Sequence, residues 1–106
     1  MKYVVLGTLD KGAITTGSRV SRAKKKLADL DIKVESILYT QGEYDFVDIL
    51  DAPNPEAMLA FSVWYTKQGY GALRSMPAFD EAAMNKAIKG PKAGGRKGAR
   101  SGRARK

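Results

Sequence analysis

Apolar and polar positions recur along the chain with two periods, one typical of strands and one of helices. Short runs rich in β-branched and aromatic residues predict strands, whereas apolar residues three or four positions apart predict amphipathic helices. In chain order we expect a strand over 3–9, a helix over 18–30, strands over 32–40 and 44–50, a helix over 55–68, a strand over 72–78 and a short helix over 80–88.

Turn and cap residues support these boundaries. Gln41-Gly42-Glu43 separates the second and third strands, and Gly42 can supply the positive φ that a tight turn often needs. Asn54 and Pro55 form a strong helix start, as N-cap and first helical residue. Trp64 lies at helical spacing with other apolar residues and is expected to anchor the core, and Gly69 is a natural stop for this helix.

The order of strands and helices predicts an α+β ferredoxin-like βαββαβ sandwich, in which a four-stranded antiparallel sheet carries both helices on one face. A chain of 106 residues suffices for one domain, which we place at residues 1–88. Because the other sheet face would lack a covering layer, we expect a homodimer. Residues 89–106 hold five Gly, one Pro and eight basic residues, so we predict a disordered basic tail there.

Charge divides the chain at the same point. Of the 19 Lys and Arg, eight lie in residues 89–106, which contain no Asp or Glu, so residues 1–88 hold 11 basic (19 − 8) and 11 acidic side chains. We predict that the tail binds polyanions nonspecifically, with nucleic acid as the first choice; anionic lipid headgroups or a gain in solubility are the alternatives. The tail residues expected to contact phosphates are Lys89, Lys92, Arg96, Lys97, Arg100, Arg103, Arg105 and Lys106.

Composition also excludes several kinds of chemistry. The chain contains no Cys and no His, which excludes disulfides, thiolate metal sites and a cysteine nucleophile and removes the commonest catalytic base. We therefore expect no metal and no cofactor. The start of the chain has too short an apolar run for a signal peptide, and no run approaches the roughly 20 apolar residues of a transmembrane segment. We expect a cytoplasmic protein.

The segment from Gln41 to Pro53, QGEYDFVDILDAP, resembles the GYD domain family, whose members share a Gly-Tyr-Asp hairpin, an apolar strand and an acidic-Ala-Pro entry to a helix. The similarity covers roughly residues 2–81 and stops before the basic tail. It implies the dimeric α/β-barrel superfamily, in which two ferredoxin-like subunits pack their sheet faces together. The family signature falls on Gly42, Tyr44 and Asp45, and no catalytic role comes with these positions.

Alternation in the third strand separates Val47 and Ile49 from Asp48, and we predict that the Val47 face packs against the helices. Asp48 would then point into the dimer cleft, where a poorly solvated carboxylate can act as acid or base. The weak catalytic candidates are Asp48, Tyr44 and Arg74. The structural alternatives are an ion pair of Asp48 with Arg74 or a partner-chain Lys, or simple exposure of Asp48 to solvent. A ligand pocket lined by Tyr39, Tyr70 and Arg74 is a further hypothesis.

Three functions remain open from the sequence, which does not decide whether the protein is an enzyme. The first is a dimeric module whose basic tail binds nucleic acid. The second is a small cofactor-independent enzyme of the dimeric-barrel type, an oxygenase or isomerase acting on a small metabolite; only superfamily analogy supports that reaction class. The third is a domain that senses a small-molecule ligand at the sheet face.

Overall fold

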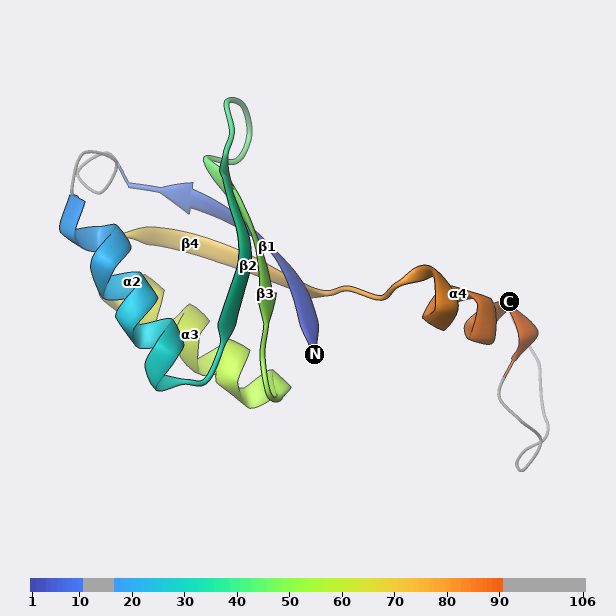
Figure 1. The fold of residues 1–106 in the computed structure, drawn as a ribbon. Helices are drawn as coiled ribbons and strands as arrows, with labels where there is room; N and C mark the ends of the chain where they lie inside the picture. The colour runs from blue at the N-terminus through green and yellow to red at the C-terminus, as the bar shows by residue number, and fades with distance from the viewer. Residues whose placement is uncertain (11–16, 91–106) are drawn as a thin grey trace.

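The computed structural model describes residues 1–10 and 17–90, and within these ranges it contains four strands and three helices (Figure 1). Their order confirms the predicted α+β fold, including the short terminal helix. The residues 91–106 of the predicted tail lie outside the described residues, and Lys89, which we assigned to the tail, ends the last helix. The elements are β1 (Lys2–Leu9), α2 (Gly17–Asp29), β2 (Lys33–Tyr39), β3 (Phe46–Asp51), α3 (Pro55–Lys67), β4 (Gly71–Pro77) and α4 (Glu81–Lys89).

The four strands form one antiparallel sheet in the order β2-β3-β1-β4. Helices α2 and α3 lie on the same side of this sheet (Figure 1). In β2, an outer strand, the register shifts between Val34 and Ser36, and the intervening Glu35 forms an ion pair with Lys2, with 3.0 Å between Nζ and Oε1. We call the sheet side without helices, in the described part of the chain, the open face.

The core lies between the sheet and the two helices because each of these elements turns its apolar side inward. Val5 and Leu50 are fully buried on the central strands, and Phe61 and Tyr65 meet them from α3. Trp64 is half-buried and stacks on Phe61, with 5.9 Å between ring centroids, which confirms its predicted place at the core. The Asn54 side chain accepts a hydrogen bond from the Ala57 backbone N–H at 2.8 Å, as expected of the N-cap of α3.

The predicted orientation of β3 is wrong. Phe46 and Leu50 are buried against the helices, whereas Val47 and Ile49 are half-buried and lie on the open face. The alternation itself was predicted correctly, but both faces of this strand are apolar, so its hydrophobicity does not distinguish the face that packs against the helices. Asp48 therefore lies on the helix side of the sheet.

Gly7 of β1 makes the inward position of Phe46 possible. The two residues are direct partners in the β1–β3 register, and a Cβ at position 7 would overlap the Phe46 ring. We expect Gly7→Ala to lower the free energy of unfolding by about 1–3 kcal/mol, because the ring must leave its well-packed position. Urea unfolding measures this loss. Gly17→Ala is the matched control, since a Cβ there meets nothing within 4 Å; equal stability losses in both variants would contradict the explanation.

Candidate functional site

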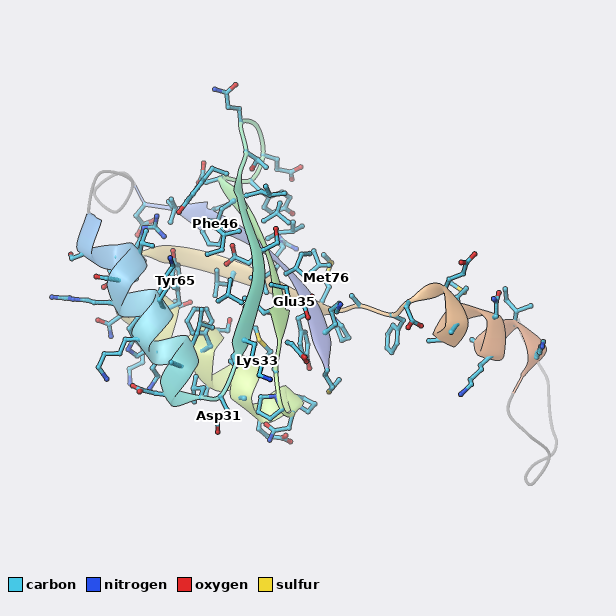
Figure 2. All side chains as sticks on the ribbon, in the orientation of Figure 1. Asp31, Lys33, Glu35, Phe46, Tyr65 and Met76 are labelled. Carbon is cyan, nitrogen blue, oxygen red and sulfur yellow. The ribbon has the colours of Figure 1, made fainter. Side chains whose placement is uncertain are left out.

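The layer between helices and sheet contains a small polar cluster made by three elements. Arg19 of α2 and Asp48 of β3 are only 7% and 9% exposed, and they are the buried charged side chains of the described residues. Arg19 donates a hydrogen bond from Nη1 to the Tyr65 hydroxyl of α3 at 3.1 Å. Figure 2 shows Tyr65 inside this layer, and its ring lies 6.2 Å from the Phe46 ring, centroid to centroid. We call Arg19, Asp48 and Tyr65 the buried triad.

Two atoms of the buried triad lack partners among the described residues. Neither Asp48 Oδ1 nor Arg19 Nε has a hydrogen bond, although both atoms are buried. Both residues line a cavity of about 30 Å³, which has room for one or two water molecules. Because a buried polar atom without a partner costs free energy, a bridging water is the simplest occupant that these atoms and this volume fit. The cavity is too small for a metabolite.

Burial also changes the acid–base properties of the buried triad. Removal from water raises the pKa of Asp48 from 3.8 to about 6, and attraction to the Arg19 guanidinium offsets this rise only partly. Burial likewise raises the pKa of the Tyr65 hydroxyl, opposed by its interactions with Arg19. The carboxyl group of Asp48 therefore changes its protonation state closer to neutrality than a solvated aspartate does.

The structure separates the three catalytic candidates. Asp48 belongs to the buried triad on the helix side, whereas Arg74 pairs with Leu6 in the register and lies on the open face. The sheet thus stands between them, so the ion pair of Asp48 with Arg74, one of the structural alternatives, does not form within the chain. Tyr44 and Arg74 do lie together, at a hollow of about 200 Å³ at the open face, next to Leu6. A catalytic group that combines all three side chains does not form within this chain.

The hypothesis of a ligand pocket lined by Tyr39, Tyr70 and Arg74 is also wrong, because the structure does not bring these side chains together. Tyr70 is buried in the core, where its ring packs edge-on against Tyr65 at 5.3 Å between centroids. Tyr39 is 63% exposed and lines the mouth of the buried-triad cavity from β2. Because Arg74 faces the opposite side of the sheet, these three side chains cannot contact one ligand.

The family-signature residues shape the turn between β2 and β3. Gly42 has φ +134°, which a residue with a side chain rarely adopts. The Asp45 side chain accepts a hydrogen bond from the Leu9 backbone N–H at 2.6 Å, and the Asp45 N–H donates to the Gly7 carbonyl at 2.7 Å. Asp45 thereby fastens the turn to β1. The φ of Gly42 confirms its predicted role in the turn, and the contacts of Asp45 give it a structural role there.

Sequence reasoning missed Arg19 and Tyr65, although a signal for each was present. Arg19 precedes Ala23 and Leu27 by four and eight positions, which places it on the inward side of α2. Tyr65 follows Phe61 by four positions on the inward side of α3. A basic residue on the apolar side of one helix, together with Asp48 in a strand, is the pattern that would have indicated the buried triad.

Neither metal ligation nor membrane crossing has support in the described residues. Within residues 1–10 and 17–90, no three acidic side chains come together in a way that could hold a metal ion. No helix in these ranges combines the length and the apolar character needed to cross a membrane.

A four-stranded antiparallel sheet in the order β2-β3-β1-β4, with α2 and α3 on one face, defines a ferredoxin-like α+β domain. The family model of the GYD domain matches residues 3–88, so the chain belongs to the GYD domain family. The match includes all but the last residue of α4. Comparison with curated proteins gives no match. The family description specifies no function.

Proposed function

We propose that the protein is a homodimeric module that pairs through its open face and binds nucleic acid nonspecifically through its basic C-terminal segment. The observation that carries the nucleic-acid part is the separation of charge, since residues 89–106 hold eight basic and no acidic side chains while residues 1–88 are balanced at 11 and 11. Closely spaced cations release counterions from a phosphate backbone without any need for a fitted groove.

Pairing through the open face is supported by its two adjoining apolar rows. Register partners place Leu38, Val47 and Leu6 side by side in one row. Ile49, Val4 and Met76 form the second row. Leu38 and Met76 are 60% and 43% exposed, and the residues between them are half-buried. A contiguous apolar surface of this kind marks an interaction site, and a second copy offers a matching one.

Charge-removal variants of the full-length protein test nucleic-acid binding. The variant replaces five basic residues of this segment by glutamine: Arg96, Lys97, Arg100, Arg103 and Arg105. We expect it to bind duplex DNA at least about tenfold more weakly at physiological salt, because the free energy gained from counterion release is lost. Mobility-shift titrations across a salt series measure both affinity and slope. If all eight basic side chains contact phosphates, the logarithm of the DNA-binding constant falls with the logarithm of the salt concentration with a slope of about −7. The slope of the variant should be much shallower.

The matched control removes charge from the folded domain instead. Arg22, Lys24 and Lys25 are exposed on α2, and their replacement by glutamine should leave DNA affinity nearly unchanged. Equal losses in both variants would place binding on the domain, and an unchanged affinity in the tail variant would overturn the proposal.

A further inference from the structure

Helix α4 carries an apolar stripe with no cover in the described part of the chain. Phe79, just before the helix, is 77% exposed, and Met84 and Ile88 inside it are 59% and 74% exposed. Met84 and Ile88 are four residues apart and so lie on the same side of the helix. Figure 1 shows α4 apart from the sheet and from both other helices.

An uncovered helix of this length needs a partner. The Asp80 side chain caps α4 by accepting from the Ala83 N–H at 2.8 Å, but the helix has only nine residues and none of them is buried among the described residues. Isolated helices shorter than about 12 residues are marginal in water, and most helical stability comes from packing of the apolar side. Helix α4 is therefore expected to dock on an apolar surface.

The outer side of α3 offers such a surface. Leu59 and Val63 are 64% and 49% exposed and line an open groove of about 490 Å³ together with Ala60 and Trp64. Glu56 lies at the start of this groove and Lys67 at its end. The groove thus combines an apolar floor with opposite charges at its two ends.

The stripe of α4 matches the groove when the two helices run antiparallel. Met84 and Ile88 have the same four-residue spacing as Val63 and Leu59, so one alignment pairs Met84 with Val63 and Ile88 with Leu59. The same alignment brings Glu81 to Lys67 at one end.

At the other end of this alignment, Lys89 lies near Glu56. The charges at both ends are thus complementary, and the antiparallel helix dipoles also attract one another. Apolar spacing and charge therefore favour the same alignment.

The link before α4 disfavours docking in the groove of the same chain in this direction. Pro77, which ends β4, lines a hollow with Pro55, Met58, Leu59 and Ser62, on the first half of α3. The four Cα–Cα steps from Pro77 to Glu81 span at most about 14 Å when fully extended, whereas Glu56 and Lys67 are about 16 Å apart along the helix axis. The start of α4 therefore reaches the first half of α3 more easily than the end of the groove at Lys67.

The parallel alignment that a chain could reach within itself brings like charges together. It would set Glu81 beside Glu56 and Lys89 towards Lys67. Like charges at close range destabilise the contact. A second copy has no such restriction, because its α4 can enter the groove from the opposite end.

We propose that α4 is an exchange arm, which docks antiparallel in the α3 groove of a second copy of this chain. Each chain has one arm and one groove, so two copies can exchange arms reciprocally about a twofold axis. The contact involves α3 and α4 and not the open face. It is therefore independent of pairing through the open face, and each contact can be removed without the other.

Cysteine crosslinking of full-length chains tests the exchange directly, since the natural sequence has no Cys. A Val63→Cys chain is mixed with a Met84→Cys chain and treated with a short bis-maleimide. The expected result is a covalent heterodimer. Asn85→Cys, which displaces the thiol by one position around α4, is the matched control and should give little product with Val63→Cys.

Charge reversal then tests the direction of docking. Lys67→Glu in the Val63→Cys chain should reduce the heterodimer, and Glu81→Lys in the Met84→Cys chain should restore it. The double variant Val63→Cys/Met84→Cys identifies docking within one chain, because it would then crosslink as a monomer. A monomeric product, or no heterodimer from the mixed single variants, would overturn the proposal, whether or not the open faces pair.

Discussion

In a Met84→Asp background, in which α4 cannot dock in the α3 groove of another copy, replacement of Val47 by aspartate is expected to convert the proposed open-face dimer into a monomer. Val47 lies on the open face between Leu6 and Leu38, at the centre of one apolar row. In a twofold dimer each substitution occurs twice, so two carboxylates would lose water in the same interface. A buried charge without a partner costs several kcal/mol, and we expect the dimer dissociation constant to rise at least about a hundredfold.

Sedimentation velocity across a concentration series measures this effect, and circular dichroism verifies that the variant remains folded. Ala28→Asp is the matched control, because Ala28 is exposed on α2, away from the open face. It should leave the sedimentation coefficient unchanged. A Met84→Asp protein that sediments as a monomer, or a Met84→Asp/Val47→Asp variant that stays dimeric, would contradict pairing through the open face.

The second large effect is a pH-dependent change in stability caused by Asp48. Its pKa in the folded state is about 6 against an ordinary value of 3.8, so folding favours the protonated carboxyl group. The resulting stabilisation is fully present below pH 3.8 and is lost as the pH rises through 6. A difference of about two pKa units corresponds to at most about 3 kcal/mol.

Asp48→Asn removes this ionisation. The free energy of unfolding of the wild type, minus that of the variant, should fall by up to about 3 kcal/mol between pH 4 and pH 7.5. Arg19 from α2 and Tyr65 from α3 also face this carboxyl group. Urea unfolding at both pH values measures the change, and a constant difference would show that Asp48 does not titrate there.

Asp51→Asn provides a control of opposite sign. A hydrogen bond from the N-terminal ammonium of Met1, at 3.0 Å, lowers the pKa of the exposed Asp51 carboxyl group. Its contribution to stability is therefore present above pH 3.8 and lost as the pH falls further. The difference between wild type and Asp51→Asn should then change mainly below pH 4, which separates the two carboxyl groups experimentally.

The order of strands and helices could be predicted because local signals and periodicity agreed. Gly42 supplies the positive φ of the turn between β2 and β3, and Asn54 caps α3. Helix α4 begins at Glu81, one residue after its predicted start, with Asp80 as its N-cap. Each of these roles depends on residues a few positions apart. The sequence contains such information directly, and the GYD resemblance supported the same boundaries.

The orientation of β3 could not be predicted in this way. Val47 and Ile49 are as apolar as Phe46 and Leu50. The charge of Asp48 indicated that the side of β3 with Phe46, Asp48 and Leu50 is the less buried one. What decides the orientation is the fit of the Phe46 ring over Gly7, 39 residues earlier in the chain, together with the approach of Arg19 from α2. Alternation fixes the period of a strand, whereas long-range packing selects its inner face.

The irregularity of β2 limits how copies of this protein can associate. A strand at the border of a sheet can recruit further strands without end, and the register shift between Val34 and Ser36 interrupts the straight backbone that such recruitment needs. Lys33 and Glu35 add charge at the same place. At the opposite border, Pro77 of β4 has no N–H to donate. The two borders of the sheet thus disfavour fibrous strand recruitment, which leaves the open face as the surface of the sheet for the proposed pairing.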